Sequence, residues 1–298
     1  MDIPAAGVQS LVVLATLGDL IEDVVVRVAE PVNVASDTEA VVERRRGGSA
    51  ANVAATAAML GHRVRFLGQV GDDALGASLL GRLEDGGVDT SFVRRAGSTG
   101  TIVVLVDATG ERTMLTDRRS CVDLRDPAPD WLDGVTTLHV PLYSFAGGPL
   151  ADTATTLVAW AHERDVDVAI DLSSTTLLRA LGRERVVELL RSLRPAAVFA
   201  NRDEADRVGL RHLPTDAVVV VKDGAHPAVL RVPIPDSPGS VESLVIPPIG
   251  IERVEDTTGA GDAFAAGFLT SRDWRTESAE ACVWGHRAAH RILTGHRP

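Results

Sequence analysis

The segment Asp256-Thr257-Thr258-Gly259-Ala260-Gly261-Asp262 decides how this sequence is interpreted, and an apolar, helix-forming run follows it over Ala263–Leu269. Its two glycines allow the backbone to approach a ligand closely. The first amides of the following helix have no partner within the helix, so they can bind an anion such as phosphate. Asp262 then lies in the first turn, where a carboxylate can accept the proton of an attacking hydroxyl. The alternative is a threonine-capped helix start in which Asp262 only complements the helix dipole.

Charge and composition exclude several classes of function. The chain has 298 residues, a formal net charge of −11 and a pI near 5.2, which disfavours nucleic acid and anionic membranes as partners. The apolar run Leu11–Leu17 is too short for a membrane span and follows no basic segment, so we expect neither a transmembrane helix nor a signal peptide. The two cysteines, Cys121 and Cys282, lie far apart, which fits a reducing cytoplasm.

The lysine content restricts the phosphate chemistry that is open to this chain. Lysine and arginine total 30 and Lys222 is the single lysine, so 30 − 1 = 29 residues are arginine. A Walker A loop needs Gly-Lys-Ser/Thr, and protein kinases need a strand lysine and a His-Arg-Asp loop, none of which occurs. Any phosphate must therefore be bound by another device.

Short apolar runs alternate with helical patterns along the chain, which indicates βαβ units and a mostly parallel, buried sheet. The predicted strands are Leu11–Leu17, Val64–Gly68, Thr137–Val140, Val166–Asp171, Ala197–Ala200 and Ala217–Val221. The predicted helices are Ser49–Leu60, Ala74–Glu84, Leu150–Glu163, Glu184–Leu193, Glu204–Val208, Gly261–Leu269 and Glu277–Leu293. The proline-rich stretch Pro233–Pro248 is expected to form turns between late strands.

Two segments have strand character but no helix. The first runs over about 23–46, and the second, over about 98–117, predicts a hairpin with its turn at Asp107-Ala108-Thr109-Gly110. Four strands without helices suggest a small β flap on the main layer, and such a flap can exclude water from a binding site.

Two further motifs predict a site for a polyol. Gly47-Gly48 precedes a helix of small residues that carries Asn52, whose amide can both donate and accept. Asp19 and Asp23 follow the first strand, where open parallel sheets bind ligands. Each motif has a structural alternative, a glycine turn before an alanine-rich helix and a solvated acidic turn.

Asn201-Arg202-Asp203-Glu204 also follows a predicted strand. Asn201 and Glu204 would share a helix face, and oxygen ligands of this kind suit Mg²⁺, often through water. The alternative is a capping box in which Asn201 starts the helix and Glu204 closes it.

Taken in order, these motifs resemble the ribokinase-like (PfkB) carbohydrate kinases over essentially the whole chain. The resemblance rests on Gly18 with Asp23, Gly47-Gly48 with Asn52, the segment from Gly68 to Gly76, Asn201 with Glu204, and 256–262. It implies a single domain over 1–298 with a three-layer α/β/α sandwich, a mostly parallel central sheet, and a β lid that often forms a homodimer interface.

The resemblance also implies an ATP- and Mg²⁺-dependent transfer of a phosphoryl group to a sugar hydroxyl. In that family the position of Asp262 is the base, and the amides of Gly259, Ala260 and Gly261 form the anion hole. Asp23, Gly48 and Asn52 match sugar-binding positions, to which we add Asp19 and Gly47. The expected nucleotide and metal positions are Asn201, Lys222, Gly224, Thr258, Gly259, Gly261 and Glu204, with Asp256 as a ligand for a monovalent cation such as K⁺.

The sequence departs from the family where Pro227 replaces the second glycine of the usual Gly-x-x-Gly after Gly224. Two other functions stay open. One is a nucleoside kinase of the same superfamily, which an aromatic side chain stacking a base would favour. The other is a sensor without catalysis, which an altered base would favour, whereas Asp262 is intact.

Overall fold

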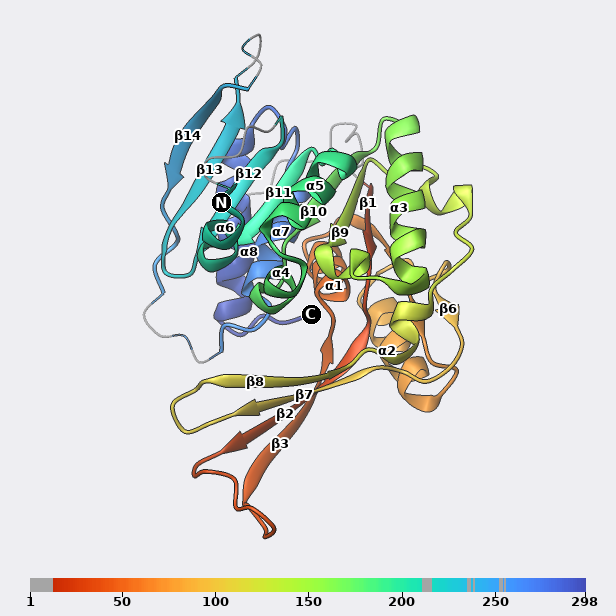
Figure 1. The fold of residues 1–298 in the computed structure, drawn as a ribbon, viewed down its shortest axis with the longest axis vertical. Coiled ribbons are helices and arrows are strands. Elements are labelled where there is room, and N and C mark those ends of the chain that lie inside the picture. The colour runs from red at the N-terminus through yellow and green to blue at the C-terminus, as the bar shows by residue number, and fades with distance from the viewer. Residues whose placement is uncertain (1–12, 211–215, 235–236, 238, 252–253, 255) are drawn as a thin grey trace.

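The computed structural model describes residues 13–210, 216–234, 237, 239–251, 254 and 256–298, and its main body is built on one large sheet (Figure 1). The sheet has eight strands in the order β14-β13-β12-β11-β10-β9-β1-β4. The pairs from β4 through β12 are parallel, and β13 and β14 are antiparallel additions at one edge. Their bounds are β1 Val13–Leu17, β4 Arg63–Leu67, β9 Thr137–Pro141, β10 Asp167–Asp171, β11 Ala197–Asn201, β12 Val218–Asp223, β13 His226–Pro233 and β14 Val241–Ile246.

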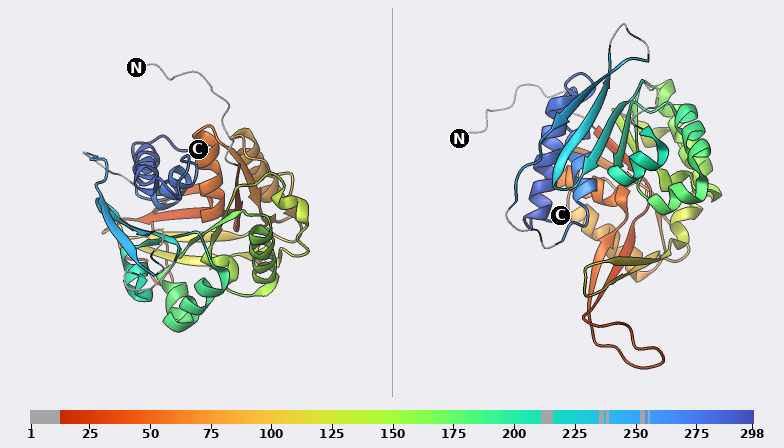
Figure 2. Two further views of the ribbon diagram at one scale, coloured as in Figure 1. Left: turned by 90° about the horizontal axis from the view of Figure 1, so that it is seen from above. Right: turned by 60° about the vertical axis from the view of Figure 1, so that its left-hand side comes forward.

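Helices cover both faces of this sheet, which explains why its strands are near-continuous apolar runs (Figure 2). One layer packs around Phe66, Phe199 and Phe268, and its helices are α1 Ser49–Met59, α2 Ala74–Asp85, α7 Ala260–Leu269 and α8 Ser278–Leu293. The other packs on the opposite face, with α3 Gly148–Glu163, α4 Thr175–Leu181, α5 Arg183–Leu193 and α6 Arg202–Val208. Three short 3₁₀ helices lie at Arg119–Asp123, Pro129–Leu132 and Leu142–Phe145. The three-layer α/β/α sandwich is confirmed.

A second sheet projects from the main body, below it in Figure 1. Its order is β3-β2-β7-β8, with β2 Ile21–Val28, β3 Ala40–Gly47, β7 Thr101–Val106 and β8 Arg112–Asp117. One face carries Val25 beside Val104, and Val104 beside Met114. A two-stranded ribbon, β5 Gln69–Val70 with β6 Arg94–Arg95, forms a third, small sheet.

Most predicted elements agree with the structure within two residues. Leu11 and Val12 of the first predicted strand lie outside the described residues. The helix α4 was not predicted, because its seven residues are too few for a clear helical period. The expectation for Pro233–Pro248 is wrong in part, since β14 runs through it and pairs with β13. No helix among the described residues is long and apolar enough to cross a lipid bilayer.

Candidate active site

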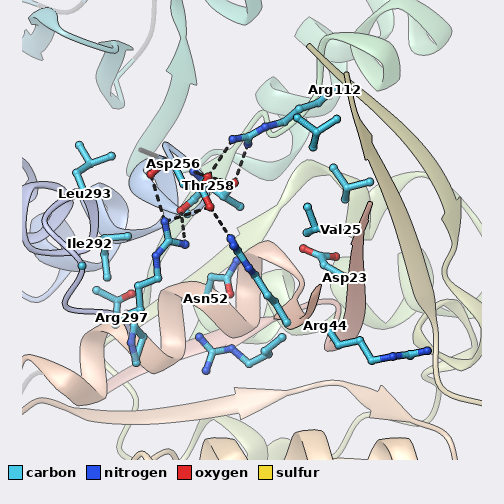
Figure 3. Close-up of a pocket in the computed structure, with 18 of the residues that line it drawn as sticks. Asp23, Val25, Arg44, Asn52, Arg112, Asp256, Thr258, Ile292, Leu293 and Arg297 are labelled. Carbon is cyan, nitrogen blue, oxygen red and sulfur yellow. Dashed lines mark hydrogen bonds and ion pairs between the residues drawn. The ribbon is translucent and has the colours of Figure 1, made fainter. Parts of the chain in front are cut away.

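A cavity of about 950 Å³ opens between the second sheet and the ends of α1, α7 and α8 (Figure 3). Asp23 and Asn52 line it from one side, and Thr258 and Gly259 line it from the segment before α7. The chain thus brings the polyol-site residues and the glycine segment, which are about 200 positions apart in sequence, to one space.

Asp262 lies in the first turn of α7, half-buried, with both carboxylate oxygens engaged. Ser49 Oγ donates to Oδ1 at 2.6 Å and Asn52 Nδ2 donates to Oδ2 at 3.0 Å. Burial, the largest influence, raises the pKa of Asp262, although these two hydrogen bonds act against the change. A carboxylate whose pKa is raised toward neutrality is better matched to accepting a proton than an ordinary aspartate.

The glycine segment reaches the helix through a left-handed residue, because Gly259 has φ 79°. The amides of Gly259 and Gly261 donate to no residue that the structure describes, so both remain available to an anion. The Ala260 amide instead donates to the Thr257 carbonyl at 3.2 Å, closing a turn. Two of the three expected anion-hole donors are therefore free in this conformation.

The glycine pair before α1 is required by close approach. A Cβ on Gly47 would lie 2.1 Å from Asp23 Oδ1, and one on Gly48, whose φ is 97°, would lie 2.1 Å from the Asp19 carbonyl oxygen. Burial and the nearby Asp262 carboxylate raise the pKa of Asp23 to about 6, against the lowering influence of Arg45.

Asp19 has a different place from Asp23. Both of its carboxylate oxygens accept from the guanidinium of Arg118, at 2.6 and 2.8 Å, and it does not line the cavity. The expected sugar-binding role of Asp19 does not fit this arrangement, and Asp19 instead fixes Arg118.

Asn201 and Glu204 form the capping box that the sequence offered as the alternative. Asn201 Oδ1 accepts from the Glu204 amide and Glu204 Oε2 accepts from the Asn201 amide, both at 2.9 Å. The Asn201 side-chain oxygen is thus occupied by the capping hydrogen bond, whereas the second carboxylate oxygen of Glu204 takes no part in the capping box. Burial and the neighbouring Asp171 carboxylate raise the pKa of Glu204 to about 7.

Lys222 completes this end of the site. Its Nζ lies 2.8 Å from Asp171 Oδ2 and 3.4 Å from the Gly261 carbonyl oxygen. Burial alone would lower the pKa of Lys222, but the Asp171 carboxylate raises it, so the ammonium stays charged. Gly224 lies in the β12–β13 turn with φ 57° and open space where a Cβ would stand.

Three arginines surround Asp256 (Figure 3). Arg45 Nη1 contacts Oδ2, Arg112 Nη2 contacts Oδ1 at 2.9 Å, and Arg297 Nη2 lies 3.3 Å from Oδ2. Burial alone would raise the pKa of Asp256, but hydrogen bonds from Thr258 and Arg45 lower it far below its ordinary value. The expected monovalent-cation site does not fit this arrangement, because three guanidinium groups repel a cation from that carboxylate.

Sequence reasoning missed several residues of this site. Ser49 stands inside the Gly-Gly motif, and Asp171 ends a parallel strand at the edge where ligands bind, so both carried a signal. Arg112 and Arg297 carried none, because their pairing with Asp256 joins positions that are 144 and 41 residues apart.

The protein is an α/β sandwich in which two free backbone amides at a helix start lie beside a half-buried carboxylate. The model of the pfkB family carbohydrate kinases matches residues 13–297, and the chain belongs to that family. It is therefore an ATP-using kinase of sugars or nucleosides.

Individual relatives agree with this placement. The chain is 34% identical over 255 residues to the ATP-dependent ribose-1-phosphate kinase of Halopiger xanaduensis, covering 81% of this chain and 78% of that one. It is 29% identical to a fructokinase of Klebsiella pneumoniae, with 75% of each covered. The crystal structure of adenosine kinase from Sinorhizobium meliloti superimposes with a TM-score of 0.81 at 26% identity, covering 97% of this chain and 96% of that one.

Proposed function

We propose that this protein transfers the γ-phosphoryl group of ATP to a hydroxyl of a sugar or sugar-derived substrate, with Asp262 as the general base. The observation that carries the proposal is the position of Asp262 between Ser49 and Asn52 at the start of α7, beside the free amides of Gly259 and Gly261. A base, a polyol-binding amide and an anion-binding helix start then meet in one place.

The residues divide the reaction among them. Asn52 and Asp23 hold the substrate so that its hydroxyl faces Asp262, which takes the proton as the hydroxyl attacks. The amides of Gly259 and Gly261 stabilise the negative charge that develops on the phosphoryl oxygens. Lys222, fixed by Asp171, places a permanent positive charge 3.4 Å from the Gly261 carbonyl and so near the same phosphoryl group.

The fit of Mg²⁺ depends on Glu204 and Asp171. The described residues hold no cluster of three or more His, Cys, Asp or Glu side chains that could bind a metal by themselves. Glu204 keeps one free carboxylate oxygen near Asp171, and a pair of carboxylates suits Mg²⁺ held partly through water and the phosphates of ATP. When bound, the ion would neutralise phosphate charge, whereas Asn201 serves by fixing Glu204.

A sugar fits the cavity better than a nucleoside. No aromatic side chain lines the described part of the cavity, so no aromatic ring there can stack on a base. The chain is nevertheless similar to an adenosine kinase, and a nucleoside remains the second candidate.

We further propose that the chain acts as a single domain and that the second sheet, from about 23–46 and 98–117, is its lid. The inner face of this sheet lines the cavity, so it can exclude water. The outer face carries an apolar cluster, with Val26 beside Val42 and Leu105, and Val103 beside Leu115. Val42 and Leu115 are 55% and 61% exposed, which supports a homodimer through this face.

The assay is ATP consumption against a panel of sugars, sugar phosphates, sugar acids and nucleosides. We expect turnover with a sugar-derived compound and its loss in Asp262→Asn. Turnover with nucleosides alone would replace the sugar by the second candidate, and a fully active Asp262→Asn would remove the proposed base. We place the reaction in the cytoplasm, because both cysteines are free and ATP is available there.

A further inference from the structure

The side chains that line the cavity carry more positive than negative charge. Seven arginines and three aspartates line it, a surplus of four positive charges, in a chain whose net charge is −11. A local charge opposite to that of the whole chain concentrates a ligand of the other sign, in this case an anion.

Four of these arginines already form ion pairs. Arg44 Nη1 lies 2.5 Å from Glu22 Oε2, and Arg45, Arg112 and Arg297 share Asp256. The ion pairs with Asp256 join the second sheet and the end of the chain to the segment before α7.

The other three are Arg27, Arg46 and Arg82. None of their side chains forms a hydrogen bond or ion pair with any residue that the structure describes. Arg46 is notable because its Nε is buried without a partner, and a buried donor normally finds one. These guanidinium groups therefore have donors available to a ligand.

Arg46 also has the right neighbours. It lies near the end of β3, immediately before Gly47-Gly48, and close enough to Asp262 and Arg82 for both charges to affect it. Arg82 reaches the cavity from α2, so the two guanidinium groups face one space from two elements with no acid pairing them.

We propose that the substrate is a sugar that already carries a phosphate monoester, and that Arg46 and Arg82 bind this ester while the free hydroxyl faces Asp262. This inference rests on the proposed function. A monoester is close to dianionic at neutral pH and balances two guanidinium groups, whereas a carboxylate carries one charge and balances only one of them. In the reaction the bond from the γ-phosphorus to ADP breaks, a bond to the sugar oxygen forms, the proton passes to Asp262, and the products are ADP and a sugar bisphosphate.

The first experiment compares kcat/KM for ribose, fructose and glucose with kcat/KM for the monophosphate esters and the sugar acid of each. We expect at least one ester to exceed its parent sugar by roughly 100-fold or more, since two charge-assisted contacts are gained. A parent sugar or sugar acid that is used as well as the esters would overturn the inference and leave the proposed kinase function standing.

The second experiment uses Arg82→Gln, at an exposed position of α2, and Arg46→Gln, with a melting curve to check that each variant folds. Each should raise KM for the ester by roughly 10- to 100-fold while KM for ATP stays unchanged. The matched control is Arg185→Gln on α5, where the Arg185 side chain is 68% exposed and forms an ion pair with Glu188 at 3.6 Å. Unchanged KM for the ester, or an equal rise in KM for ATP, would contradict the assignment.

A calorimetric titration without ATP separates this inference from the proposed function. If no member of the panel is phosphorylated, the proposed function fails. The affinities of the protein for ribose 5-phosphate, fructose 6-phosphate and glucose 6-phosphate then test the anion site by itself. Binding that Arg82→Gln weakens supports the site, whereas no binding of any of these esters to the wild-type protein overturns it.

Discussion

Asp256 and Asp262 stand six positions apart in one segment, yet their surroundings are opposite. Asp256 is surrounded by three guanidinium groups that hold its pKa far below the ordinary value. Asp262 accepts hydrogen bonds from two neutral donors, Ser49 and Asn52, and burial raises its pKa. The comparison teaches that the charges brought to a carboxylate, and not its distance from the motif glycines, decide whether it can accept a proton.

The largest test of this contrast is to neutralise each carboxylate in turn. Asp262→Asn should lower kcat by a factor on the order of 10² or more, because general bases typically contribute 10²- to 10⁴-fold, with little change in ATP affinity. Asp256→Asn should reduce kcat far less. Steady-state kinetics on both variants checks this, and equal losses of kcat would erase the distinction between the two sites.

We expect Asn52 and Asp23, which lie near Asp262, to contribute to the affinity for the sugar and not to the affinity for ATP. Asn52→Ala and Asp23→Ala are each expected to weaken substrate binding by roughly 10- to 100-fold, the usual worth of a hydrogen bond that involves a charged group. ATP affinity should be unaffected. Calorimetry with both ligands measures this, with Asp152→Ala on the exposed side of α3 as the control. Normal substrate affinity in both variants would reject the placement of the sugar.

Glu204 extends the comparison to a third carboxyl group. Its pKa is about 7 in the folded protein against an ordinary 4.5, so its ionisation costs folding free energy. That cost is absent below pH 4.5, grows between the two values and is complete above pH 7. Glu204→Gln, which keeps the capping box, should therefore raise the free energy of unfolding by on the order of 1–3 kcal/mol at pH 8 and by nothing near pH 4. Urea titrations at both pH values provide the measurement, and a gain that does not depend on pH would contradict the cause.

We expect Asp256 to contribute to the free energy of unfolding, whereas Asp262 contributes to kcat. Asp256→Ala leaves three partly buried guanidinium groups without their shared partner, so we expect a loss of about 1–2 kcal/mol, between the values for surface and fully buried pairs. Urea unfolding of this variant at pH 7 measures the loss. A variant as stable as the wild-type protein would show that the cluster contributes nothing to the fold.

The smallest expected effect is that of the monovalent cation. Because guanidinium groups already satisfy Asp256, the rate should be the same in K⁺ and in tetramethylammonium at equal ionic strength. Faster turnover in K⁺, abolished by Asp256→Ala, would mean that the arginines leave Asp256 and that the family's cation site forms.

Much of the fold could be predicted from the sequence, because its signals are local. Strand β12 is a continuous valine run, Gly47-Gly48 precedes an alanine-rich helix, and β2, β3, β7 and β8 lack intervening helices. The register of the second sheet, which points Val25 and Val104 into the cavity, follows from the alternation along its strands.

The sequence by itself determined the α/β sandwich, the glycine segment and the candidate base, since each depends on residues within one turn or one strand. Only the tertiary structure decided that Asp19 is neutralised by Arg118 while Asp23 lines the cavity, and that Asp256 is surrounded by arginines from β3, β8 and the end of the chain. The physical reason is that the ionisation of a carboxyl group depends on burial and on charges within a few ångströms. Those charges come from segments that only the folded chain brings together.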